Sequence, residues 1–285
     1  MEPGYPAPGY AVSMSNWIIK HATHKDNSPA IRLEAVAVQY NGTPALREVS
    51  LTLQPGQRAA IVGPNGAGKT SLMQVIAGTL RPSAGSVEIF GHRPGGHVCI
   101  AYLPQRSQID WDFPVTVREV AMMGRIRKIG LFRWPTRRDW SLVDEALGRV
   151  GLSGFQDRRI AELSGGEQQK VFLAQALAQE AEVVLLDEPF NGLDMPTQAS
   201  ILDILDELRA ARVTAIVATH DLNLAAERFD RVLLLQRQLI AFGTPAQVFT
   251  RSNLMQAYGG HVHMLPDGEG LMILTDTCCE GDEAE

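Results

Sequence analysis

"QRAAIVGPNGAGKT", residues 57–70, joins an apolar run to a glycine-rich loop that ends in lysine and threonine. Residues 57–62 predict a buried strand, and residues 63–70 fit the spacing G-x-x-x-x-G-K-[ST] of a phosphate-binding loop. Glycines let backbone N–H groups turn toward phosphate oxygens, and the start of the next helix adds a partial positive charge. The stretch therefore predicts an α/β nucleotide-binding domain. The flanking strand and helix disfavour the alternative, a glycine-rich turn without a ligand.

The loop supplies most of the candidate phosphate ligands. Lys69 is expected to reach the β and γ phosphates, and the Thr70 hydroxyl to bind Mg²⁺. The residues assigned to nucleotide binding here are Gly63, Pro64, Asn65, Gly66, Ala67, Gly68, Lys69, Thr70 and Ser71.

Hydrophobic patterning predicts two kinds of strand around this loop. Short apolar runs separated by helical patterns indicate strands of a largely parallel sheet, and they occupy residues 181–187, 213–220 and 231–236. Alternating, β-rich runs indicate an antiparallel β subdomain at residues 31–41, 47–56 and 85–91. Turns are expected at Asn41-Gly42 and Pro55-Gly56. The predicted fold is α/β.

The middle of the chain, about residues 107–163, has a helical pattern instead. Thr116 and Glu119 form a capping-box pattern, which predicts a helix beginning at Thr116. A second helix is expected over residues 139–150 with Asp139 as its cap. This region is predicted to be a helical subdomain inserted in the α/β core.

Composition limits the class of protein. The chain has 285 residues, is 45% hydrophobic, and has no apolar run near the roughly 18–20 residues that span a bilayer. Its first residues lack the basic and apolar regions of a secretory signal, which favours a cytoplasmic protein with a disordered N-terminal extension over residues 1–29. Five acids near the C-terminus account for most of the net charge of −6, so no nucleic-acid partner is expected.

The cysteines and histidines raise one alternative hypothesis, a zinc site near the C-terminus. Three cysteines do not make a disulfide framework, and Cys99 is expected in the core. His261 and His263, with Cys278 and Cys279, could suggest zinc, but they form no evident four-ligand set.

Two later strand ends carry candidate catalytic residues. "VVLLDEP", residues 183–189, places Asp187 and Glu188 at the end of a buried strand, where α/β folds bind ligands. We expect Asp187 to hold Mg²⁺ and Glu188 to accept a proton from the attacking water. His220 ends another strand and is expected beside the γ-phosphate, although an isolated histidine is more often structural.

The segment "LSGGEQQKVFLAQALA", residues 163–178, begins a helix in an unusual way. Ser164 and Glu167 form another capping box, yet two glycines in the first turn cost roughly 1 kcal/mol each relative to alanine. Those glycines make sense if the backbone must approach a ligand closely, since a helix start is a phosphate-binding surface.

The order of these motifs resembles the ATP-binding subunit of ABC transporters. The phosphate loop is followed by Gln105, "LSGGE", "LLDEP", "GLD" (192–194) and His220. The resemblance covers about residues 30–250 and implies an ABC ATP-binding domain over residues 30–252, followed by an extension with an acidic tail over residues 253–285. It implies an ATPase that uses ATP and Mg²⁺.

In that family two subunits pair head to tail, with each ATP between them. The resemblance implies that Ser164, Gly165 and Gly166 contact the ATP held by a second copy, and that Asp194 communicates across the dimer. Tyr40 matches the aromatic that stacks on adenine, with a core tyrosine as the alternative. Glu167 and Lys170 depart mildly from the common glutamine and arginine, and Glu167 is expected to point back at the cap.

Gln105 matches the glutamine that links the nucleotide site to the helical subdomain, where it contacts Mg²⁺ or the attacking water. The residues after it form, in this family, the groove for a membrane permease subunit. That role suits the exposed mixture expected of Trp111, Phe113, Met122 and Met123, although packing inside the subdomain is the alternative for the two methionines. The subunit is therefore expected at the cytoplasmic face of the membrane, bound peripherally.

The run "QIDWDFPVTVREVAMMGR", residues 108–125, resembles importers of manganese, zinc and iron(II). That likeness implies import of a divalent metal, manganese ahead of zinc, supplied by an extracytoplasmic binding protein. The alternatives are an importer of an iron-siderophore or haem, and a soluble ABC ATPase without a transport role.

A run of six bases without an acid, residues 125–138, interleaves with Leu131, Phe132 and Trp134. It is either a solvated basic face or a surface near phospholipid headgroups.

Overall fold

The computed structural model describes residues 27–94, 100–105, 111, 113–130, 132–259, 262–264 and 271–273, the last two as backbone only. The predictions made for residues 1–26, Cys99, Leu131, His261, Cys278 and Cys279 lie outside these residues. No helix in the described part of the chain is both long and apolar enough to cross a membrane.

The central sheet has six strands in the order β5-β6-β7-β3-β8-β9. Every neighbouring pair is parallel except β8 and β9, which confirms the predicted largely parallel sheet. Residues of β3, β6 and β7 are all buried, as expected for strands covered on both faces. The strands are β3 Arg58–Val62, β5 Ile100–Leu103, β6 Val183–Asp187, β7 Thr214–Ala218, β8 Arg231–Leu235 and β9 Leu239–Gly243.

A second, antiparallel sheet has the order β2-β1-β4, with β1 Ile31–Tyr40, β2 Thr43–Leu53 and β4 Ala84–Ile89. Asn41 and Gly42 both have positive φ, the geometry of a tight two-residue hairpin turn. Such a turn matches the twist of the strands, so pairing begins directly at Tyr40 and Thr43. For this reason β2 begins four residues before the predicted strand at residue 47.

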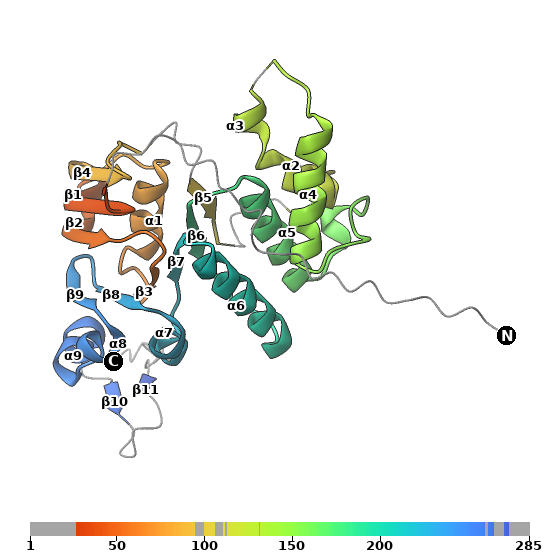
Figure 1. The fold of residues 1–285 in the computed structure, drawn as a ribbon. Helices are drawn as coiled ribbons and strands as arrows, with labels where there is room; N and C mark the ends of the chain where they lie inside the picture. Colours follow the sequence, from red (N-terminus) through yellow and green to blue (C-terminus); the bar gives the residue numbers. More distant parts are fainter. Residues whose placement is uncertain are drawn as a thin grey trace, which may run out of the picture.

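Helices cover both faces of the central sheet (Figure 1). Helix α1, Lys69–Ala77, buries Leu72 and Ile76 in a core shared by the two sheets. A second core takes buried residues from the helices of the middle of the chain and from α6 Met195–Ala210, α7 Leu222–Arg228, α8 Pro245–Val248 and α9 Arg251–Tyr258. A backbone hairpin follows, with β10 Val262–Met264 and β11 Leu271–Ile273.

The middle of the chain forms the helical region drawn in green in Figure 1. Its elements are α2 Val117–Met123, α3 Ile126–Ile129, α4 Arg137–Arg149, the 3₁₀ turn η3 Ile160–Glu162 and α5 Gly165–Ala178. Thr116 caps α2 in a complete capping box with Glu119, as predicted. Helices α2 and α4 both pack on α5, which connects this region to β6.

The predicted cap of α4 is wrong. Thr136, not Asp139, is the N-cap, and the helix begins at Arg137. The Asp139 carboxylate reaches back to accept hydrogen bonds from the backbone N–H and the hydroxyl of Thr136. Asp139 is thus the third residue of the helix and completes the capping box from there. The sequence pattern alone did not show whether Asp139 was the N-cap or this third residue.

Candidate nucleotide site

The phosphate loop connects the carboxyl end of β3 to the start of α1. Gly68 has φ 96°, and a Cβ there would lie 2.6 Å from the Ala45 oxygen and from a Leu46 methyl, so the loop cannot carry a side chain at this point. A Cβ at Gly66 would meet nothing within 4 Å. The loop is therefore packed tightly on its inner side and open on its outer side, which is the shape of a cradle for an anion.

Lys69 is buried and turns back over this loop. Its Nζ donates to the Gly63 carbonyl at 2.9 Å and lies 3.7 Å from Glu188 Oε1. These partners are the loop and a candidate catalytic carboxylate, so the ammonium is placed at the mouth of the cradle where phosphate charge would lie. Lys69 and the open backbone of Gly66 fit a bound polyphosphate.

Asp187 ends β6 and is only 2% exposed. Neither carboxylate oxygen has a geometrically acceptable hydrogen-bond partner among the described residues. Burial raises the pKa of Asp187, while the nearby Thr70 hydroxyl and Lys69 ammonium act in the opposite direction. A buried carboxylate without donors, beside a threonine hydroxyl, is a donor set that fits Mg²⁺.

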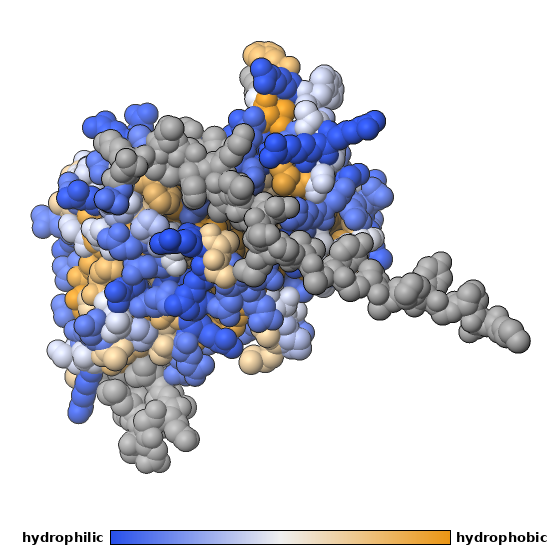
Figure 2. Space-filling model, viewed as in Figure 1, coloured by the Kyte–Doolittle hydropathy of each residue, from blue (hydrophilic) through white to orange (hydrophobic). Residues whose placement is uncertain are grey.

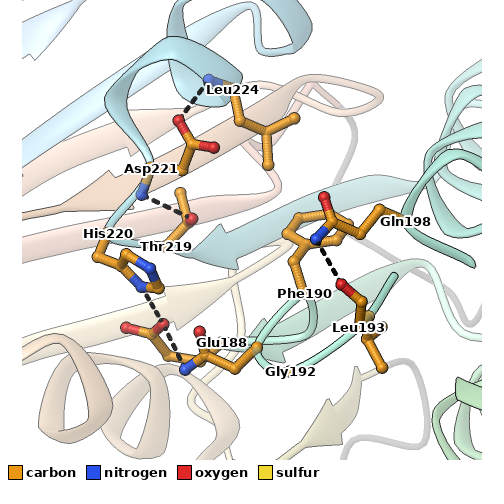
Figure 3. Close-up of a pocket in the computed structure, with 10 residues that line it drawn as sticks. Glu188, Phe190, Gly192, Leu193, Gln198, Thr219, His220, Asp221 and Leu224 are labelled. Atoms are coloured by element: carbon orange, nitrogen blue, oxygen red, sulfur yellow. Dashed lines mark hydrogen bonds and ion pairs between the residues drawn. The ribbon is translucent and has the colours of Figure 1, made fainter. Parts of the chain in front are cut away.

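Glu188 follows Asp187 and points into a pocket of about 200 Å³ (Figure 3). One oxygen, Oε2, lies 2.9 Å from His220 Nδ1 and accepts a hydrogen bond from Asn191 Nδ2 at 3.1 Å. The other oxygen faces Lys69. The Glu188 backbone has φ 53°, a left-handed conformation that costs a non-glycine residue on the order of 1–3 kcal/mol and is common at functional sites.

Two further predicted residues lie beside this group. Gln105 comes two residues after β5, the strand that pairs with β6, and is half-buried. Its position is therefore at the same carboxyl edge of the sheet as Asp187. Tyr40 ends β1 with 46% of its surface exposed, and its hydroxyl lies 3.3 Å from Ser71 Oγ. An exposed ring beside the phosphate loop fits a stacking surface for an aromatic base.

The predicted signature residues lie in a different part of the chain. Ser164 caps α5, and both its backbone N–H and its hydroxyl donate to Glu167. These hydrogen bonds lower the pKa of Glu167, and they confirm that this carboxylate points back at the cap. A Cβ on Gly166 would lie 2.5 Å from the Thr197 methyl, so the α5 start packs closely on α6. Asp194 is the N-cap of α6 but makes no side-chain capping bond.

Sequence reasoning missed three residues of this site. Asn191 holds Glu188, and its proximity to the "GLD" run was the available signal. Tyr102 lies near Asp187, and burial beside that carboxylate raises the pKa of its phenol. Tyr258, from α9, is half-buried near Gly63 and Glu188, and burial raises the pKa of its hydroxyl too. No local pattern could reveal Tyr258, which comes from the far end of the chain.

The expected permease groove is exposed only in part. Phe113 and Met123 are exposed, as predicted for an interface, but Met122 is buried. Trp111 is half-buried and packs edge-on against Phe172 of α5, with ring centres 5.6 Å apart. Trp111, expected at the interface, is therefore only partly exposed, because α5 covers one side of the ring.

No cluster of three or more histidine, cysteine, aspartate or glutamate residues that could hold a metal occurs in the part of the chain that the structure describes. His263 lies in β10, and only its backbone is described.

Comparisons with known proteins agree with this geometry. The sequence model of a family described as "ABC transporter" matches residues 46–191. The manganese transport system ATP-binding protein MntB of Bacillus subtilis is 41% identical over 83% of this chain and 95% of its own length. The zinc transport system ATP-binding protein TroB of Treponema pallidum is 43% identical over 82% of this chain and 88% of its own length.

A solved structure gives the same result for the fold. CbiO1 from Clostridium perfringens, part of the ABC transporter complex CbiONQ, superposes with a TM-score of 0.67 at 28% identity. The match covers 80% of this chain and 94% of that chain.

Proposed function

The chain belongs to the ABC transporter family as an ATP-hydrolysing subunit, and we propose that it powers import of a divalent metal ion, manganese first and zinc next. The observation that carries the metal assignment is its similarity to MntB and TroB, whose names specify manganese and zinc, over nearly their whole lengths. The ATP subunit need not touch the metal, so this assignment rests on the relatives and not on a metal site in the chain.

The geometry supports a simple division of work in ATP hydrolysis. Tyr40 stacks on the base, and the loop from Gly63 to Ser71 binds the phosphates with its N–H groups. Lys69 leaves the Gly63 carbonyl and donates to the phosphate oxygens. Thr70 and Asp187 would hold Mg²⁺, with Gln105 nearby, and the bound ion would neutralise charge on the phosphates.

Glu188 is the proposed general base. Its carboxylate takes a proton from the attacking water, whose oxygen then bonds to the γ-phosphorus as the bond to the β-phosphate oxygen breaks. His220 and Asn191 support this role because both contact Oε2 and so fix the direction of the carboxylate. His220 is well exposed, so it can also turn toward the γ-phosphate as predicted.

Two partners follow from this assignment. A second copy of the chain pairs head to tail, so that Ser164, Gly165 and Gly166 close over the ATP of the other copy and Asp194 lies at the interface. Permease subunits dock near Gln105, where Phe113 and Met123 are exposed. The subunit is then peripheral at the cytoplasmic face of the membrane, and the extracytoplasmic binding protein is reached only through the permease.

Cellular metal content tests the transport assignment. Cells whose only copy carries Glu188→Gln should lose accumulation of one metal, manganese or zinc, under metal limitation, as measured by elemental mass spectrometry. Glu227→Gln, an exposed acid on α7, is the matched control and should leave accumulation at the wild-type level. Unchanged manganese, zinc and iron in the Glu188→Gln cells would overturn the metal assignment. A loss confined to siderophore-bound or haem iron would favour the alternative substrate.

A further inference from the structure

The connection from α3 to α4 projects from the helical region with two almost fully exposed aromatic side chains. Phe132 is 95% and Trp134 is 90% exposed, and Ile126 of α3 is 50% exposed. We call residues 126–130 and 132–138 the basic-aromatic finger. Figure 1 shows it at the top of the molecule, and Figure 2 shows hydrophobic and hydrophilic surface side by side on the same projection.

Four exposed arginines lie near these aromatics in the sequence. None of them forms an ion pair with another described residue, and no acid occurs in the sequence from residue 125 to residue 138. The set is Arg127, Arg133, Arg137 and Arg138. A single-sign surface of this kind attracts anions and repels basic partners.

The other two basic residues of the run, Arg125 and Lys128, anchor the finger to the rest of the protein. Arg125 is buried and donates to the Ala178 carbonyl, to Glu180 and to Asp139. Lys128 donates to Glu180 at 2.8 Å. Although burial acts against it, pairing with Lys128 and Arg125 lowers the pKa of Glu180. This network fixes the base of the finger to the end of α5, so the tip is held away from the body of the protein.

We propose that the basic-aromatic finger docks on an anionic phospholipid surface. Tryptophan and phenylalanine place their rings at the depth of the headgroups, while arginines at the same level pair with lipid phosphates. A purely solvated face would explain the arginines but not two aromatic side chains left in water. The inference goes beyond the proposed function, because it assigns the chain a lipid contact of its own in addition to its permease contact.

Flotation of the purified full chain with lipid vesicles tests the proposal without any permease. The protein should float with vesicles that contain phosphatidylglycerol and not with pure phosphatidylcholine, and added salt should weaken binding because it screens charge. Phe132→Ser/Trp134→Ser should lower the vesicle partition coefficient at least about tenfold, since apolar surface no longer enters the interface. Arg133→Gln/Arg137→Gln should lower it about thirtyfold on anionic vesicles.

Matched variants elsewhere on the surface control for general effects. Met195→Ser/Met255→Ser removes exposed apolar side chains outside the finger, and Arg81→Gln/Arg251→Gln removes the same charge. Both should bind vesicles as the wild type does.

The proposal fails if wild-type protein does not float with anionic vesicles, or if the finger variants float as well as the wild type. Finger variants that lose only permease co-purification would show that the finger faces protein, which also overturns it. Each of these failures leaves the metal and ATPase assignments standing, since they are tested in cells by Glu188→Gln.

Discussion

Asp187 is a buried carboxylate whose environment disfavours its own charge. Burial raises its pKa, and neither oxygen has a hydrogen-bond partner within the described residues. A group with a raised folded pKa is destabilising when ionised, so the folded state carries this penalty above the folded pKa and loses it as the pH falls below the unfolded pKa. Binding of a divalent cation removes the same penalty by pairing with the carboxylate.

Asp187→Asn should therefore raise the urea midpoint of the protein at neutral pH in EDTA. The difference from wild type should shrink as the pH falls toward the ordinary range of an aspartate, because wild-type Asp187 becomes protonated. With Mg²⁺ and a nonhydrolysable ATP analogue, the wild type should gain stability and the variant should gain less. Asp203→Asn, an exposed acid on α6, should show neither effect. A lower midpoint for Asp187→Asn in EDTA would contradict this account.

At the scale of elements, three helices of the helical region begin with the same reciprocal cap, at Thr116, Thr136 and Ser164. Thr116→Ala and Ser164→Ala should each cost about 1 kcal/mol in the free energy of unfolding, since each loses a side-chain acceptor for a helix N–H. Only Ser164→Ala should also lower ATP turnover, by tenfold or more, if its hydroxyl contacts the ATP of a second copy. Thr116→Ala is thus the matched control. Equal turnover in the two variants, measured above the dimerisation concentration, would show that Ser164 acts only as a helix cap.

These elements also show how far the sequence could predict the structure. Strands β1 to β4 and β6 to β8, and the caps at Thr116 and Ser164, follow local patterns that the structure confirms, whereas β5 and β9 were not predicted. The predicted start of α4 was wrong because Asp139 by itself fits the N-cap pattern. Only its contact with Thr136 shows that Thr136 is the N-cap and Asp139 the third helical residue. The burial of Arg125 by Glu180 and Ala178, and the position of Tyr258 near Gly63, depend on contacts between distant segments that no local spacing encodes.

At the scale of the whole molecule, the candidate site is divided between two places. One end of the central sheet brings Lys69, Asp187, Glu188 and His220 together. Ser164 and Gly166 instead begin α5, where Gly166 packs on α6 near Asp194. The Ser164 hydroxyl donates to Glu167 of its own helix, so a hydrogen bond to a phosphate would replace this internal one. In the proposed arrangement, a second copy placed head to tail would supply such a phosphate and complete both sites.

Glu188→Gln tests this arrangement and the general base together. Removing the base should lower ATP turnover by about 10²–10⁴, while leaving phosphate binding to Lys69 and the loop intact. ATP then persists between the copies, so the variant should change from monomer to dimer on addition of ATP, measured by size-exclusion chromatography with light scattering. Glu188→Gln/Lys69→Ala should remain monomeric, because it lacks the ammonium that holds the phosphates. Wild-type turnover in Glu188→Gln would remove Glu188 as the base. A variant that loses turnover but stays monomeric with saturating ATP would instead place the whole site within one chain.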